Sequence, residues 1–203
     1  MAVLVVLVLC AVAAPAPFDY YVLSLSWAPE FCAQPGAAAA NPRECATKPG
    51  TGFVVHGLWP EAAQGKNPES CGPANRVAGN VIKIALPYMP SASLIQHEWA
   101  THGACTGLSP AAYFFDVVQA RSAVQLPVQM TSVEVALTES PALIEGQFAA
   151  ANTAFPKNAF RAVCRNGALS EVRICFNRDL MPIECPASAG ECADAAANIL
   201  PVR

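Results

Sequence analysis

The stretch "AFRAVCRNGALSEVRICF", residues 159–176, decides the fold class of this chain. Its centre, Asn166-Gly167, is a dipeptide that favours the tight two-residue turn of a β-hairpin. Apolar and β-branched residues run along both flanks, as the strands of a half-buried sheet require. The stretch therefore predicts two antiparallel strands, over 159–165 and 168–176.

Two earlier segments also have the composition of strands. The segment "DYYVLSLSW" (19–27) alternates and is rich in aromatic residues, and "GFVVHG" (52–57) is a short apolar run that ends at a glycine. Gly57 and Pro60 predict a turn directly after this run. A further strand is expected over "LMPIEC", residues 180–185.

The middle of the chain predicts helices. One follows Pro90, begins with the capping box Ser93-x-x-Gln96 and ends at Gly103.

Two more helices, over 109–124 and 140–155, open with Ser-Pro, in which serine caps the helix and proline takes its first position. The alanine-rich segment 34–45 predicts a loop held between two cysteines. Helices in the middle and strands at both ends indicate an α+β fold, a central antiparallel β-sheet flanked by several α-helices.

Composition restricts the class of protein. A chain of 203 residues with 54% hydrophobic and 13% charged residues fits one globular domain and excludes a disordered chain. The apolar N-terminus is too short to span a bilayer and ends in small residues, which predicts a signal peptide over 1–15 and one domain over 16–203. We expect a secreted or periplasmic monomer that has no membrane anchor once the signal is cleaved.

The net charge of −3 argues against a protein that coats nucleic acid over many phosphates, but not against an enzyme that grips a few nucleotides. Of the nine cysteines, Cys10 lies in the predicted signal, and the even set that remains predicts disulfides in an oxidising compartment. None of these cysteines forms a Cys-x-x-Cys pair, so a zinc knuckle or a thioredoxin-type site has no support.

Two of the three histidines lie in "QHEWATHGAC", residues 96–105. A zinc protease of the His-Glu-x-x-His kind needs histidines four residues apart, whereas His97 and His102 are five apart and point about 140° away from each other on a helix. Glu98 and His102 are four apart, so we expect the carboxylate to hydrogen-bond the imidazole and orient it.

The third histidine, His56, lies in "FVVHGLWP", residues 53–60. Two histidines on separate elements suit a reaction that needs a base and an acid together, such as cleavage of an RNA phosphodiester. Nearby, Trp59 and Trp99 either stack bases or pack in the core.

"FVVHGLWP" and "HEWATHGAC", in this order, resemble the two active-site segments of the ribonuclease T2 family. "LSLSWAPEFC", "ESC", "EVRIC" and "IECP" extend the resemblance, and "TGLSPAAYF" is most similar to bacterial members. The resemblance implies a secreted endoribonuclease that cleaves single-stranded RNA through a 2′,3′-cyclic phosphate, with low base specificity and with neither metal nor cofactor.

Residue by residue, the resemblance implies that His56 and His102 are the catalytic pair, with His102 as the base toward the 2′-OH and His56 as the acid. Glu98 matches the carboxylate that supports the histidine and the phosphate transition state. The resemblance also implies four disulfides, namely Cys32–Cys45, Cys71–Cys105, Cys164–Cys192 and Cys175–Cys185.

The substrate-binding residues follow from the same resemblance. His97 matches a ligand of the substrate phosphate, and Trp59 and Glu61 match positions that contact a base. Thr101 departs from the family, which usually has lysine there, and a charged contact of this kind is often worth roughly 2.7–4 kcal/mol. We therefore expect a slower enzyme, or one in which another cation replaces the lysine.

Two rival classes remain. One is a catalytically weak or inactive family member that acts as a secreted RNA-binding protein, because Thr101 replaces the usual lysine. The other is a metal-dependent hydrolase that uses His97, Glu98 and His102.

Overall fold

The centre of the fold is a six-stranded β-sheet, seen in a computed structural model that describes residues 17–45 and 52–202. Along the sheet the order is β2-β1-β5-β6-β3, and β4 pairs with β5. The pairings are antiparallel except for a short parallel contact between β5 and β6, which confirms the predicted α+β class. The strands are β1 (Tyr20–Trp27), β2 (Phe53–Glu61), β3 (Leu137–Glu139), β4 (Phe160–Arg165), β5 (Ala168–Phe176) and β6 (Ala197–Ile199).

The predicted hairpin forms β4 and β5, and Asn166 and Gly167 take the positive φ angles of 51° and 77° that its turn requires. β5 then pairs with β1, so the hairpin joins the middle of the sheet. The strand predicted over 180–185 is wrong, because only a single bridge between Phe176 and Pro182 forms there. β3 and β6 were not predicted, since three residues are too few for a readable alternation.

β2 is longer than predicted. The turn expected at Gly57 and Pro60 is wrong, because the strand continues through both residues to Glu61. β2 lies at the edge of the sheet, where a proline need not donate an N–H to a neighbouring strand.

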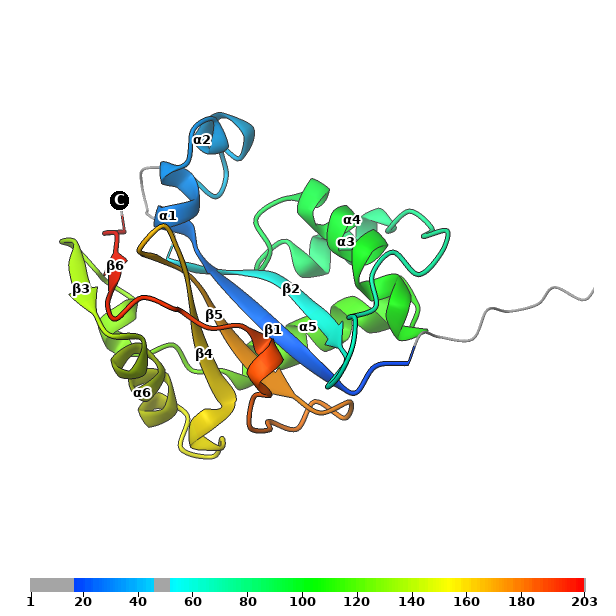
Figure 1. Ribbon diagram of the computed structural model, residues 1–203. Coiled ribbons are helices and arrows are strands. Elements are labelled where there is room, and N and C mark those ends of the chain that lie inside the picture. Colours follow the sequence, from blue (N-terminus) through cyan, green and yellow to red (C-terminus); the bar gives the residue numbers. More distant parts are fainter. Residues whose placement is uncertain (1–16, 46–51, 203) are drawn as a thin grey trace, which may run out of the picture.

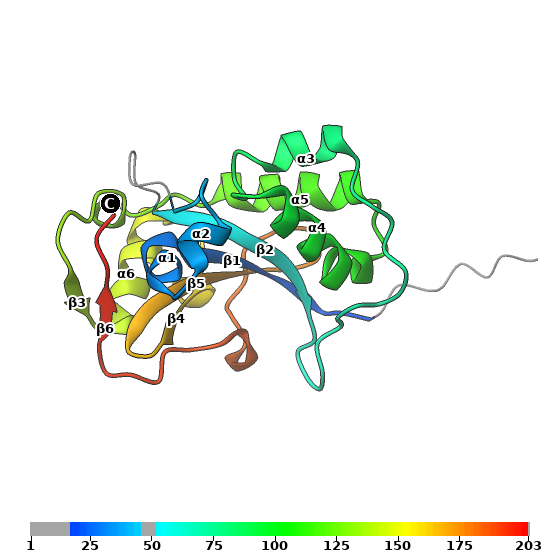
Figure 2. The ribbon, with the colours of Figure 1, turned by 90° about the horizontal axis from the view of Figure 1, so that it is seen from above.

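Within the part of the chain that the structure describes, six α-helices surround the sheet (Figures 1 and 2): α1 (Ala28–Ala33), α2 (Ala37–Ala40), α3 (Gly79–Ala85), α4 (Ala92–Thr101), α5 (Pro110–Ala123) and α6 (Pro141–Ala151). Short 3₁₀ turns are η1 (Gly103–Thr106), η2 (Val128–Met130), η3 (Lys157–Ala159) and η4 (Ala187–Ala189). Helices α3, α4 and α5 group beside β2, whereas α6 packs against β4.

The two Ser-Pro helix starts are confirmed. Ser109 accepts a hydrogen bond from the Ala112 N–H at the start of α5, and Ser140 accepts one from the Leu143 N–H at the start of α6. The second helix ends at Ala151, before the predicted limit at 155. The predicted loop 34–45 contains one unforeseen helical turn, α2.

The cap of α4 differs from the prediction. Ser91, and not Ser93, accepts the N-terminal hydrogen bond from Leu94. The Gln96 side chain does not close a capping box, and accepts a hydrogen bond from the Val77 N–H instead. Gln96 therefore anchors the chain before α3 onto α4.

Alternation along β1 separates two environments. Leu23 and Leu25 point into the main core with the inward faces of α5 and α6, and the Tyr113 hydroxyl ties α5 to β2 by donating to the Leu58 carbonyl at 2.9 Å. The opposite face carries a smaller apolar cluster: Tyr20, Val22, Trp59, Cys175, Cys185 and Ala189.

The described residues contain four disulfides, the same four pairs that the resemblance implies: Cys32–Cys45, Cys71–Cys105, Cys164–Cys192 and Cys175–Cys185. Among residues 17–45 and 52–202, no helix has the length and apolar character needed to cross a membrane. The predicted signal peptide over 1–15 lies outside the described residues.

Candidate active site

A β-bulge in β2 sets the position of His56. Gly57 pairs with Ser24 of β1 and Val55 pairs with Leu25, so His56 is an extra residue with no partner in the ladder. A bulge bends the strand and redirects the side chain of its extra residue. The His56 ring thereby reaches the small-cluster face of the sheet.

In the middle of that face β1 contributes only small side chains. Ser24 lies between Gly57 of β2 and Arg173 of β5. Ser26 lies between Val54 of β2 and Glu171 of β5. Side chains from β2 and β5 can therefore meet across β1.

His56 makes two carboxylate contacts on this face. Its Nδ1 lies 3.0 Å from Glu171 Oε1, and its Nε2 lies 3.6 Å from Glu98 Oε1 of α4. The imidazole is 36% exposed, while Glu171 is 13% and Glu98 only 1% exposed. An accessible imidazole is thus held from both sides by buried acids.

Gly57 lets Glu98 approach the strand. Trp59 Nε1 donates a 2.8 Å hydrogen bond to Glu98 Oε2 directly above Gly57. A Cβ on Gly57 would overlap that carboxylate and stand 2.5 Å from Trp59 Nε1. The glycine of "HGLWP" is therefore required for the contact between helix and strand.

The contacts of Glu98 differ from the expectation. Its carboxylate meets Trp59 and His56, and no hydrogen bond or ion pair joins it to the His102 ring in the part of the chain that the structure describes. His102 is the C-cap of α4, and its backbone N–H still donates to the Glu98 carbonyl, but its ring lies against Trp59. The histidine with acidic partners is His56.

His56 and His102 both lie against Trp59. The ring centroids are 5.2 Å apart for His56 and Trp59, and 5.4 Å apart for His102 and Trp59. Two histidines that are 46 positions apart in the sequence thus border one buried indole. Trp99, the second tryptophan considered as a base platform, is buried in the main core against Tyr113.

The pKa values of the two histidines move in opposite directions. Burial lowers the pKa of His56, but the hydrogen bond to Glu171 and the charges of Glu98 and Glu171 outweigh burial and raise it above its ordinary value. Burial and the positive charges of His56 and His97 lower the pKa of His102 to about 4. The site therefore favours the charged form of His56 and the neutral form of His102.

The remaining predicted site residues lie near this pair. His97 is exposed on α4, and its charge acts on Glu98 and His102. Thr101 is half-buried, and its carbonyl accepts a hydrogen bond from Ser70 N–H at 2.7 Å. Glu61 is buried and accepts a hydrogen bond from the Asn67 amide, and burial raises the pKa of its carboxyl to about 7.

Glu171 and Arg173 were missed from the sequence. Arg173 Nε donates to Glu171 Oε2 at 2.9 Å, and its guanidinium carbon lies 5.0 Å from the centre of a Trp59 ring. Both residues belong to "SEVRIC", where alternation shows that they share a face. Only the pairing of β5 with β1 brings that face to His56.

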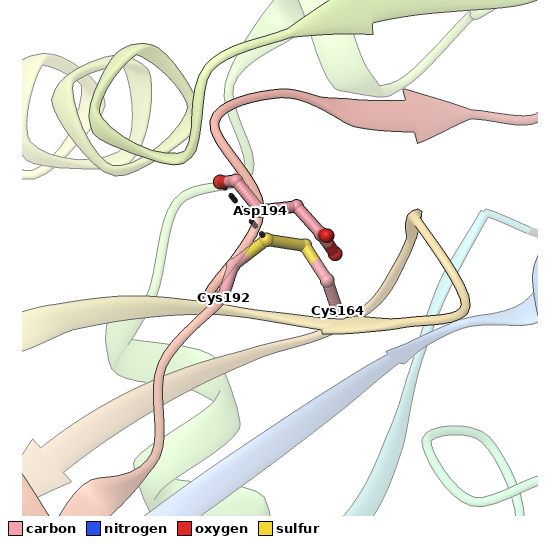
Figure 3. A group of neighbouring side chains, drawn as sticks. All are labelled: Cys164, Cys192 and Asp194. Atoms are coloured by element: carbon pink, nitrogen blue, oxygen red, sulfur yellow. Dashed lines mark hydrogen bonds between the residues drawn. A yellow bond between two sulfur atoms is a disulfide. The ribbon is translucent and has the colours of Figure 1, made fainter.

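One group of potential metal ligands occurs in the described residues: Cys164, Cys192 and Asp194 (Figure 3). The two sulfurs are joined in a disulfide, so neither is the thiolate that binds metal, and the group does not fit a metal site. The predicted triad of the rival hydrolase, His97, Glu98 and His102, does not form such a group.

Comparison with known proteins identifies the family. The family model of the Ribonuclease T2 family matches residues 18–185. The chain belongs to the ribonuclease T2 family. Among curated T2 relatives, a ribonuclease of Aeromonas hydrophila is 42% identical over 45% of this chain and 40% of its own length. A probable ribonuclease of Haemophilus influenzae is 30% identical over 85% of this chain and 62% of its own length. The chain thus spans between 40% and 62% of the length of these two relatives.

Solved structures share the T2 fold. Trichomaglin, described as an S-like ribonuclease, matches with a TM-score of 0.70 at 20% identity over 92% of this chain and 100% of its own. RNase NT in complex with 5′-AMP matches with a TM-score of 0.66 at 20% identity over 91% of this chain and 99% of its own.

Proposed function

We propose that the chain is an endoribonuclease that cleaves single-stranded RNA by transphosphorylation, without a metal ion. The observation that carries the proposal is the pair of His56 and His102, which border one indole and have opposite pKa shifts. Family membership supports the same activity, and RNase NT, which shares the fold, is known with 5′-AMP bound.

In the proposed reaction, the neutral His102 removes the proton of the ribose 2′-OH as its oxygen attacks the neighbouring phosphorus. The bond from phosphorus to the 5′ oxygen breaks, and His56 gives that oxygen a proton. The products are a 2′,3′-cyclic phosphate and a free 5′-OH. The nucleophile belongs to the substrate, so the two imidazoles supply both proton transfers.

The surrounding residues have binding roles in this proposal. His97, exposed on α4, is proposed to contact the phosphate, and Glu98 contacts both His56 and Trp59. Trp59 and Glu61 are proposed to contact a base. Thr101 lacks the charge of the usual lysine. The Arg173 guanidinium near Trp59 supports the alternative that another cation replaces that lysine.

The compartment and the oligomeric state are also proposals. Four disulfides support an oxidising compartment, so we propose a secreted or periplasmic protein whose signal peptide covers residues 1–15. We propose that it acts as a monomer with single-stranded RNA as its partner.

Thr101 favours a second candidate, a family member that binds RNA without cleaving it. The test that separates the two is incubation of the oxidised protein, without residues 1–15, with single-stranded RNA in excess EDTA, followed by analysis of the product ends. Fragments ending in a 2′,3′-cyclic phosphate, lost in both His56→Ala and His102→Ala, are expected. Absence of cleavage by folded wild-type protein that still binds RNA would establish the binding protein, and Thr101→Lys would then ask whether one charge restores cleavage.

A further inference from the structure

The contact between His56 and Glu171 has the geometry of a carboxylate that orients a catalytic imidazole. Nδ1 and Oε1 are 3.0 Å apart, and Glu171 is 13% exposed, so little water competes for the carboxylate. Fixing Nδ1 leaves Nε2 as the nitrogen on the Glu98 side of the ring. A carboxylate on one imidazole nitrogen fixes the tautomer and the direction in which the other nitrogen points.

Glu171 is itself held in place. Arg173 Nε donates to Oε2 at 2.9 Å, which leaves Oε1 for His56, and Arg173 Nη1 donates to the Ala189 carbonyl at 2.9 Å. Burial raises the pKa of Glu171, but the hydrogen bond from His56 and the charge of Arg173 outweigh it and bring the pKa to about 2. Glu171 therefore stays ionised over the whole range in which His56 titrates.

We propose that Glu171, held by Arg173, is a positioning residue that orients His56 and keeps it protonated, so that Nε2 delivers the proton to the leaving 5′ oxygen. The proposal rests on the proposed function for its catalytic part, and on the His56–Glu171 contact for its structural part. Glu171 reaches the reaction only through His56.

Other charges also face His56. Glu98 and His102 do so from α4 and its C-cap, Arg173 from β5, and Glu44 from the segment after α2. Of the carboxylates, only Glu171 is hydrogen-bonded to the ring among the residues that the structure describes. Removing its charge should therefore affect His56 more specifically than any other single change on this face.

The test is Glu171→Gln, which keeps an oxygen for Nδ1 but removes the charge. We expect the pKa of His56, followed by NMR, to fall by about one unit, since one nearby opposite charge shifts a pKa by about that much or more. The alkaline limb of the pH profile of kcat/KM should move to lower pH by the same amount. Above that limb kcat/KM should fall about tenfold, while at pH 5 it should change little.

The matched control is Glu134→Gln, which removes an exposed carboxylate from the connection before β3 and should leave both readouts unchanged. An equal loss of kcat/KM at every pH, with the His56 pKa unmoved, would show a merely structural role and overturn the proposal. If Glu171→Gln does not fold, the wild type still decides: a His56 pKa at or below its ordinary value of about 6.5 also overturns it.

The NMR titration needs no activity, so the two proposals can fail separately. If the wild type does not cleave RNA but Glu171→Gln still lowers the His56 pKa, the proposed function is refuted and the effect of Glu171 on His56 stands. If the wild type cleaves RNA through both histidines but the His56 pKa is unchanged in Glu171→Gln, only the role of Glu171 is refuted.

Discussion

Gly57 shows how one missing methyl group can define a site. The Glu98 carboxylate and the Trp59 indole meet directly above its Cα, and the same carboxylate faces His56. No positive φ angle is involved, so the requirement for glycine at this position is steric.

Gly57→Ala should displace Glu98 from Trp59 and His56. We expect a loss of roughly 1–3 kcal/mol in the free energy of unfolding, the usual cost of overpacking a buried site. We also expect at least a tenfold loss of kcat/KM for RNA cleavage, because the carboxylates around His56 would move. Chemical denaturation and steady-state kinetics measure the two effects.

Gly146→Ala is the control, since an added Cβ at Gly146 in α6 meets nothing within 4 Å. It should keep activity and stabilise the fold by about 0.5–1 kcal/mol, as alanine does in a helix interior. Full activity in Gly57→Ala would contradict the steric role assigned to this glycine.

The sequence was most informative where structure is local. Asn166-Gly167 defines its own turn, and Ser109 and Ser140 cap their own helices, so each could be predicted from a few neighbouring residues. The true length of β2 depends on its edge position, and the acidic partners of His56 depend on strands far away in the sequence. The histidines were therefore predicted, and Glu171 was not.

At the scale of elements, α4 is fixed at the end that carries His102. The Ser70 N–H donates to the Thr101 carbonyl, and Cys71 is bridged to Cys105 of η1. The long connection between β2 and α3 is thereby attached on both sides of His102. We infer that this bridge holds His102 against Trp59.

Removal of the bridge in Cys71→Ala/Cys105→Ala should therefore lower both stability and activity. The comparison is Cys164→Ala/Cys192→Ala, because the two bridges span similar separations of 34 and 28 residues. Each variant should lose about 2–4 kcal/mol of unfolding free energy. Only the first should lose kcat/KM at temperatures where both are folded, and equal kinetic losses would show that the bridge has no special relation to His102.

At the scale of the whole molecule, the buried acids make stability depend on pH. Burial raises the pKa of both Glu44 and Glu61 to about 7, from an ordinary 4.5. Such groups bind protons more tightly in the folded protein, so the stability they contribute is complete below pH 4.5 and is lost as the pH rises through 7. The raised pKa of His56 acts in the same direction.

We therefore expect a lower free energy of unfolding at about pH 8 than at about pH 6, measured by urea denaturation. Glu61→Gln should reduce this difference, because the new side chain cannot ionise. Its amide oxygen can still accept the hydrogen bond from Asn67. Glu134→Gln should leave the difference unchanged. A difference of the same size in Glu61→Gln and wild type would mean that Glu61 does not contribute to it.

The chain order of the site has a consequence during synthesis. A nascent chain that has passed residue 102 already contains both histidines, but Glu171 and Arg173 have not yet been made. β1 can hold the site together only after the β4–β5 hairpin has emerged from the ribosome and paired with it. We therefore expect the surroundings of His56 to stay unassembled until residues 160–176 have been made and β5 has paired with β1.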